Sequence, residues 1–134
     1  MELDRRTLEL VTAAARAAAK VKGEAITALN VSVRLPLTDA FVIVTGRSDR
    51  QVGAIVDEVE RQLAARGAHT VRREGDQANH WVLLDFGELV VHVQHADDRE
   101  FYGLDRLWKD CPRIALPHLD EPLVGAGASL DAAP

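Results

Sequence analysis

The feature that most constrains the fold is an uninterrupted run of apolar, mostly branched residues at 40–44, Ala-Phe-Val-Ile-Val. A short continuous run of this kind is typical of a strand that is covered on both faces. A capping-box pattern follows, with Ser48 at the cap and Gln51 three residues later. Apolar residues then recur at helical spacing until Gly67. The sequence therefore predicts a buried strand that leads directly into a helix over 48–66.

Weaker patterns predict the other elements. We expect a helix over 4–22, strands over 25–31 and 70–74, a hairpin over 79–95 with its turn at Phe86-Gly87-Glu88, and a last helix from 97 to about 108. The order α-β-β-α-β-β-β-α indicates the α/β class, with one mixed β-sheet flanked by helices.

The last helix has the pattern of an amphipathic segment. We expect Asp97 to cap it, and Phe101 to lie on its core side together with Leu104 and Trp108. Tyr102 then points the other way, and Arg99 and Asp105 are predicted to be solvated.

Composition indicates one domain followed by a tail. With 134 residues, 47% of them hydrophobic, the chain suits a single core. After Leu116 large side chains are scarce, and four of the five prolines lie in residues 112–134. We expect a domain over 1–116 and a disordered tail over 117–134.

The charge balance bears on the class of partner. The net charge is −5, although residues 1–22 hold five basic and three acidic side chains. Generic binding to phosphate backbones needs a positive field, which the chain lacks overall. A basic partner is electrostatically easier, although net charge alone does not identify one, and we expect no sequence-specific nucleic-acid binding.

Compartment and metal chemistry follow from a few residues. No apolar run reaches the length of a membrane span, the start of the chain lacks a signal-peptide pattern, and Cys111 is alone, so we expect a cytoplasmic protein. His92 and His95 fall on opposite faces of a strand and cannot share an ion there. We expect no metal and no cofactor.

The corner after the buried strand could bind an anion. Gly46 and Ser48 lie where a strand ends and a helix begins, and nucleotidyltransferases carry a Gly-Ser pair at such a corner. Those enzymes also need carboxylates on neighbouring strands to hold magnesium, and the strand over 89–94 contains none. A turn and a helix cap are the better interpretation.

The hairpin carries the strongest hint of binding. Alternation places Trp81, Leu83 and Asp85 on one face of the strand, and Val82 and Leu84 on the other. An acid beside a Trp makes full burial of that face costly. A partly covered face with an aromatic anchor and an acidic rim is typical of a binding hot spot.

Taken together, these residues resemble the ribosomal silencing factor, or Iojap-like, family. The matching pieces are Thr38-Asp39, Thr45-Gly46-x-Ser48-x-Arg50, Glu74-Gly75, Trp81, Asp85-x-Gly87, Val91-His92-Val93 and Arg99-x-x-Tyr102-x-Leu104-x-x-Leu107-Trp108. No piece is specific alone, but this order and spacing are very specific. Asn30 and Asp105 depart from the family, which more often has Asp and Glu there.

The resemblance implies a non-catalytic translational repressor. Such proteins bind the large ribosomal subunit through its ribosomal protein fourteen, a basic protein on the intersubunit face. They obstruct joining with the small subunit and so slow translation when nutrients are short. The family fold is similar to a reduced nucleotidyltransferase core, and members are often homodimeric when free.

On this interpretation the hairpin and last helix form a protein-docking surface. Trp81 is its anchor, Asp85 and Glu74 meet basic groups of the partner, Tyr102 extends the contact and His92 borders it. The motif residues Asp39, Gly46, Ser48, Arg50, Gly87 and Arg99 are predicted either to bind or to support the fold. Two alternatives stay open. One is a degenerate nucleotidyltransferase-like enzyme or nucleotide-binding protein, and the other is a plain dimerisation or scaffold module with no ribosomal role.

Overall fold

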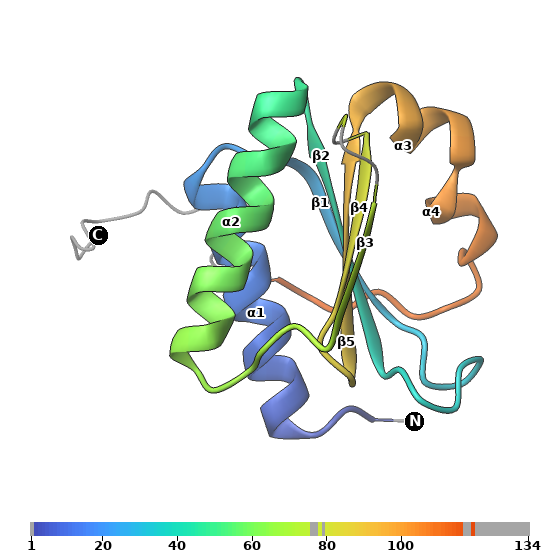
Figure 1. Cartoon of the computed structure of the whole chain (residues 1–134). Coiled ribbons are helices and arrows are strands. Elements are labelled where there is room, and N and C mark those ends of the chain that lie inside the picture. Colours follow the sequence, from blue (N-terminus) through green and yellow to red (C-terminus); the bar gives the residue numbers. More distant parts are fainter. Residues whose placement is uncertain (1, 76–77, 79, 117–118, 120–134) are drawn as a thin grey trace.

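The computed structural model describes residues 2–75, 78, 80–116 and 119 (Figure 1). Apart from Leu119, the predicted tail over 117–134 lies outside the described residues. Within the described part, none of the helices combines the length and the apolarity that a membrane span requires.

The observed elements follow the predicted order. They are α1 (Arg5–Lys20), β1 (Glu24–Asn30), β2 (Ala40–Gly46), α2 (Asp49–Ala65), β3 (Arg72–Gly75), β4 (Trp81–Asp85), β5 (Leu89–His95), α3 (Ala96–Tyr102) and α4 (Leu104–Leu107). The predicted mixed α/β fold is therefore confirmed, with the last helix divided into two.

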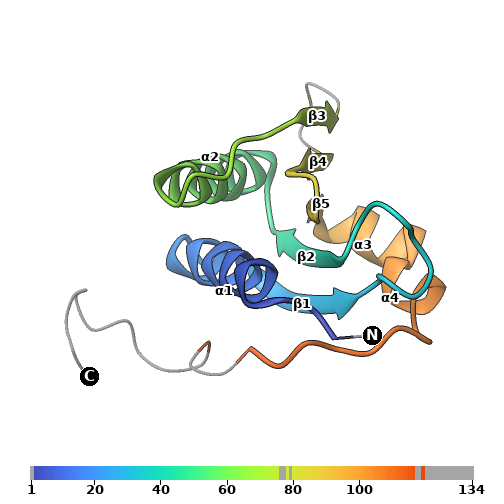
Figure 2. The same ribbon diagram turned by 90° about the horizontal axis from the view of Figure 1, so that it is seen from below.

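The five strands form one sheet in the order β1-β2-β5-β4-β3. The central pair, β2 and β5, is parallel, and every other pair is antiparallel. The parallel pair requires a crossover, which α2 supplies on one side of the sheet. In Figure 1, α1 and α2 lie together on that side, and α3 and α4 lie on the other. Figure 2 shows the same three layers end-on.

The strand predicted to be covered on both faces has that environment. All seven residues of β2 are buried. Val42 and Val44 face α1 and α2 in the larger core cluster, while Phe41 and Ile43 belong to a second cluster under α3 and α4. Two cores on opposite faces of one sheet explain why the apolar run has no alternation.

The corner between β2 and α2 is built as a helix start. Ser48 Oγ accepts a hydrogen bond from the Gln51 amide at 3.1 Å, and Gln51 Oε1 accepts one from the Arg47 amide at 2.7 Å. A Cβ added at Gly46 would come within 3.0 Å of the Val52 backbone nitrogen, so only glycine lets the helix start this close to the strand. Both motif residues thus have structural roles here.

The predicted single helix after β5 is wrong in two respects. It begins at Ala96 and is capped by His95, whose Nδ1 accepts from the Asp97 amide, so Asp97 is not the cap. It also ends at Gly103, which has the left-handed φ of 60°. Glycine adopts this conformation readily, and the chain changes direction there before α4 begins.

The change of direction reverses one core assignment. The Phe101 side chain, predicted to face the core, is 76% exposed, whereas Leu104 is buried. The spacing of an unbroken helix would put these two side chains on one face, but the break at Gly103 separates them.

The cap at the start of α2 gives a first prediction. Changing Ser48→Ala should lower the free energy of unfolding by about 1 kcal/mol, because one amide of the first turn loses its acceptor. Denaturant unfolding followed by circular dichroism measures this effect. Ser48→Asp, which keeps an acceptor, should retain the stability. If the alanine variant unfolds at the same denaturant concentration as the wild type, the role of Ser48 as a stabilising cap is wrong.

Candidate protein-docking surface

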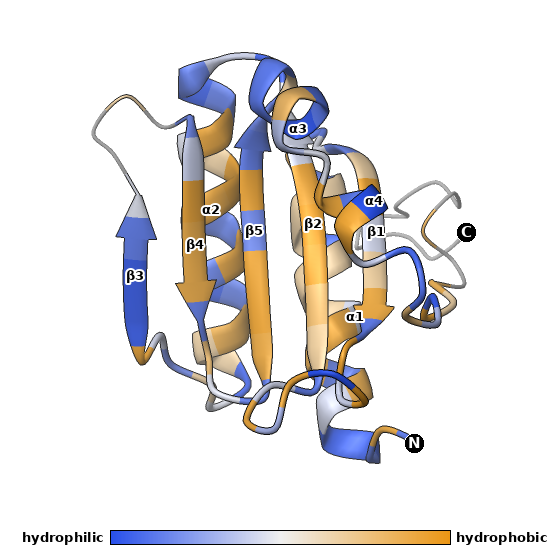
Figure 3. Ribbon diagram, turned by 90° about the vertical axis from the view of Figure 1, so that its right-hand side faces the viewer, coloured by the Kyte–Doolittle hydropathy of each residue, from blue (hydrophilic) through white to orange (hydrophobic). Residues whose placement is uncertain are grey.

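One half of the sheet is left uncovered on the side of α3 and α4. These helices lie over β5, β2 and β1, and β4 and β3 extend beyond them (Figure 3). Along β4, Val82 and Leu84 are buried against the α1–α2 side, while Trp81, Leu83 and Asp85 are half-buried. The predicted alternation is therefore confirmed, and the mixed face is the uncovered one.

Trp81 is held in place by two side chains. Its Nε1 donates a hydrogen bond to His92 Nδ1 at 3.3 Å, and its ring lies 4.8 Å from the ring of Tyr102, centroid to centroid. Because the indole N–H is satisfied within the chain, the remaining exposed surface of Trp81 is apolar. We call Trp81, Leu83, Phe101 and Tyr102 the aromatic patch. Phe101 continues it, since its ring lies 5.0 Å from that of Tyr102.

His92 lies beneath this patch. Its side chain is 5% exposed and packs edge-on against Phe41, with ring centroids 4.7 Å apart. Burial lowers the pKa of His92 to about 4, so the imidazole is neutral near pH 7. A neutral ring that accepts at Nδ1 carries its proton on Nε2. His92 thus supports Trp81 from below, and any part it plays in binding acts through the indole.

Glu74 borders a shallow hollow beside Trp81. The hollow, of about 290 Å³, is lined by Glu74, Gly75, Trp81 and Leu83. Glu74 also forms an exposed ion pair with Arg72, at 3.2 Å between Nε and Oε2. Exposed pairs of this kind are weak, so a cationic partner can compete for the carboxylate.

Asp85 is placed at the far end of β4 from Trp81, roughly 13 Å along the strand. Its Oδ1 accepts from the Gly87 amide at 2.8 Å and fixes the turn into β5. Gly87 has a left-handed φ of 97°, which glycine tolerates best. Asp85 therefore has a structural role in addition to its charge, and it does not touch the indole.

Arg99 and Asp105, predicted to be solvated, form an ion pair between α3 and α4, and Arg99 also attaches these helices to the sheet. Arg99 Nε and Nη2 donate to the two Asp105 carboxylate oxygens at 2.8 and 3.0 Å. Arg99 also donates to the Thr45 and Thr27 hydroxyls at 3.0 and 3.1 Å. Hydrogen bonding from Arg99 holds the pKa of Asp105 below its usual range. Sequence spacing misses this arrangement because its partners come from three separate strands and helices.

The remaining motif residues are not part of the aromatic patch. Asp39 contributes backbone groups, donating to the Glu88 carbonyl and accepting from the Val31 amide. Arg50 is exposed in the first turn of α2. Among the described residues, no three His, Cys, Asp or Glu side chains are grouped so that they could hold a metal ion.

The geometry is that of a small α/β domain which presents an aromatic sheet face with an acidic border. Comparison with known proteins then specifies the family. Residues 4–131 match the family described as ribosomal silencing factor during starvation, and the chain belongs to this family.

Curated relatives agree with this assignment. The ribosomal silencing factor of Halalkalibacterium halodurans is 39% identical over 108 residues, covering 81% of this chain and 92% of the relative. That of Bacillus subtilis is 40% identical over 99 residues, covering 74% and 84%. A mouse protein named mitochondrial assembly of ribosomal large subunit protein 1 is 35% identical over 86 residues, covering 62% of this chain and 38% of the relative.

Solved structures share the fold. A crystal structure from Chromobacterium violaceum has a TM-score of 0.74 at 34% identity, covering 81% of this chain and 88% of that one. A second, from Bacillus halodurans, has a TM-score of 0.70 at 36% identity, covering 84% and 100%.

The buried imidazole predicts a pH dependence of stability. The folded-state pKa of about 4 lies below the ordinary value of 6.5, so the unfolded chain binds the proton first as pH falls. The contribution of the neutral His92 imidazole to the free energy of unfolding is complete above pH 6.5 and is lost as pH falls towards 4. Relative to His92→Gln, the wild type should lose up to about 3 kcal/mol of unfolding free energy over this range.

Denaturant unfolding at pH 7, 5.5 and 4 measures the difference between the two proteins. The substitution can also change the free energy of unfolding by an amount that does not depend on pH. This does not affect the test, because only the slopes of unfolding free energy against pH are compared. His69→Gln, a change at an exposed histidine, serves as the control. Parallel pH curves for wild type and His92→Gln would contradict a buried neutral imidazole.

Proposed function

We propose that this chain is a non-enzymatic translational repressor. It binds the large ribosomal subunit through ribosomal protein fourteen, sterically blocks joining with the small subunit, and slows translation under nutrient limitation. Family membership supports a ribosome-associated role, as do the names of the relatives, which refer to ribosomal silencing and to assembly of a large ribosomal subunit. The single observation that carries the docking mechanism is the half-exposed Trp81 on an uncovered sheet face.

The composition of the aromatic patch suits a protein partner. Tyr102 is 48% exposed and Phe101 76% exposed, so both offer large rigid side chains at a small cost in conformational entropy. Glu74 and Asp85 border the patch, and the chain carries a net charge of −5. A basic protein surface is complementary to this arrangement. To block subunit joining, the chain needs only to bind the large subunit tightly and at the right place, and it does not need to catalyse a reaction.

The proposal includes a cytoplasmic location and a homodimeric free form. The exposed apolar side chains of Phe101 and Leu107 support self-association, because a second copy would remove them from water. In that case the homodimer and the ribosomal partner compete for one surface.

The nucleotide-binding alternative has weaker support. At the Gly46–Ser48 corner, the Arg47 and Gln51 amides that could face a phosphate already donate to side chains of the chain itself. Calorimetric titration with a nucleotide and magnesium tests this alternative, and saturable binding would favour it.

Removal of the anchor is the central test. Trp81→Ala should weaken association with purified large subunits by at least about 2 kcal/mol, or roughly 30-fold, the range of interface hot spots. Co-sedimentation gives the affinity, and a subunit-joining assay gives the functional consequence. Trp81→Phe should retain most of the binding, since it keeps an aromatic ring.

Leu37→Ala provides a matched control, because Leu37 is 87% exposed in the loop before β2, away from the patch. If the folded Trp81→Ala protein co-sediments as well as the wild type, the anchor is wrongly assigned. If the wild type itself does not co-sediment, the chain is a dimerisation module or acts elsewhere.

The acidic border can be tested by changing its charge alone. Asp85→Asn keeps an acceptor for the Gly87 amide, and Glu74→Gln keeps the side-chain length. Each change should slow association about 3- to 10-fold at low ionic strength and reduce its salt dependence, with little effect on dissociation. Stopped-flow or surface-based kinetics measure both rates. Asp57→Asn, at an exposed position of α2, is the control. Unchanged association at low salt would remove the electrostatic role.

A further inference from the structure

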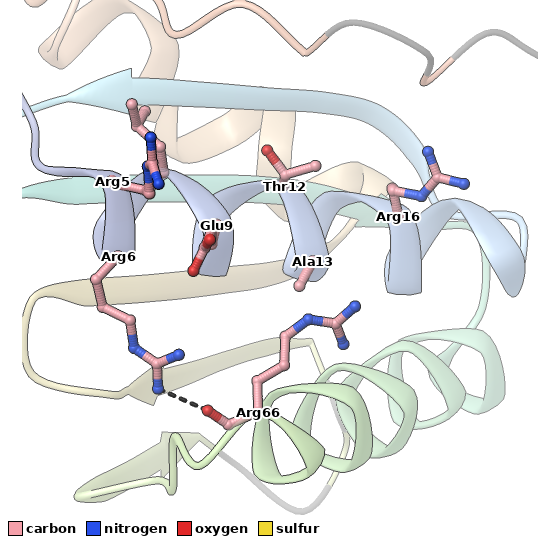
Figure 4. Close-up of a pocket in the computed structure, with 8 residues that line it drawn as sticks. Arg5, Arg6, Glu9, Thr12, Ala13, Arg16 and Arg66 are labelled. Carbon is pink, nitrogen blue, oxygen red and sulfur yellow. Dashed lines mark hydrogen bonds between the residues drawn. The ribbon is translucent and has the colours of Figure 1, made fainter.

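A second surface, lined by arginine, lies on the opposite side of the sheet from the aromatic patch. It is an open cleft of about 640 Å³ between α1 and the end of α2. Arg5, Arg6 and Arg16 line it from α1, and Arg66 lines it from the end of α2. In Figure 4, Arg6 and Arg66 point toward each other, while Arg5 and Arg16 project from the outer side of α1. The carboxylate of Glu9 is the one acidic group of the lining. We call this the arginine cleft.

None of the four guanidinium groups forms an ion pair with a carboxylate of the described residues. Of its thirteen arginines, six form ion pairs with carboxylates: Arg34, Arg47, Arg61, Arg72, Arg73 and Arg99. Four of the seven that do not are gathered in the arginine cleft. A strong local positive field can therefore exist in a chain whose net charge is −5.

The arginines at the start of α1 do not contribute to the stability of that helix. Arg5 and Arg6 occupy the first turn of α1, which has no acidic residue. Cations are unfavourable at a helix N-terminus, because the free amides there already carry partial positive charge. Arg6 has a partial explanation, since its Nη2 donates to the Arg66 carbonyl at 2.6 Å. The structure provides no comparable polar partner for Arg5 or Arg16 among the described residues.

The spacing and chemistry of the cleft define the ligand. Arg5 and Arg16 are eleven residues apart on one helix, which corresponds to about 16 Å. This span is too long for a single phosphate and suits several phosphates in a row. Guanidinium groups bind phosphate oxygens in pairs of parallel hydrogen bonds. The residues lining the cleft include no aromatic side chain on which a base could stack.

We propose that the arginine cleft binds the sugar-phosphate backbone of RNA without reading its sequence. The inference rests on the proposed function, in which the chain docks on a ribonucleoprotein particle. The aromatic patch would then contact protein while the cleft, on the other side of the sheet, engages a neighbouring RNA strand. The net charge of the whole chain does not indicate this site, because the acidic residues after residue 22 outweigh the excess of basic residues over 1–22.

The test uses the full chain and a fluorescein-labelled single-stranded RNA of mixed sequence, about 12 nucleotides long, with anisotropy read over a salt series. The double variant Arg5→Gln/Arg16→Gln should lose at least about tenfold in affinity at low salt, and the slope of log affinity against log salt should fall by about 1.4 for two lost contacts. The matched control is Arg106→Gln/Arg113→Gln, which removes two exposed arginines that lie outside the cleft and form no ion pair among the described residues. It should bind like the wild type. Thermal unfolding confirms that all variants are equally folded.

Three results would overturn the proposal: no RNA binding by the wild type, equal losses in both double variants, or equally strong competition by polyglutamate of matched charge, which would indicate an acidic protein ligand instead. Failure of the proposed function is distinguishable. Trp81→Ala should retain RNA binding while losing subunit association. RNA binding through the cleft in a chain that does not co-sediment with large subunits would leave the RNA site standing and remove the ribosomal role.

Discussion

The burial of β2 and β5 on both faces is the constraint on which the rest of the structure depends. Two central strands that are buried on both faces need two covering layers. The long helices α1 and α2 provide one layer. The short α3 and α4 provide only part of the other, so β4 keeps a half-buried face (Figure 3). The proposed docking surface lies on this half-buried face, which the second layer leaves uncovered.

The incomplete layer is attached to the sheet through one arginine. Arg99 connects α3 to Asp105, Thr45 and Thr27, and its side chain is 12% exposed. Tyr102, three residues further on, is thereby fixed against Trp81, whose N–H is held by His92. A preorganised aromatic surface loses little conformational entropy when a partner binds. Arg99 and His92 therefore position the exposed rings of Tyr102 and Trp81. Motif residues outside the aromatic patch can in this way support those inside it.

Charge is distributed unevenly over the two sides of the sheet. Glu74 and Asp85 border the aromatic patch, whereas the arginine cleft lies on the helical side. The net charge of −5 describes neither surface, because partner selection depends on the local field. The two proposed contacts, with a protein and with RNA, therefore use opposite sides of one sheet.

The sequence by itself determined the element order, the doubly covered strand at 40–44, the helix start at Ser48 and the alternation of faces along 81–85. These features follow from local periodicity and capping chemistry. Tertiary structure alone decided the exposure of Phe101, the burial of His92 and the partners of Arg99. Gly103 turns the chain between Phe101 and Leu104, so the spacing of an unbroken helix does not predict which of the two side chains is buried. His92 and Arg99 contact residues that are far apart in the chain, and only the folded sheet brings these residues together.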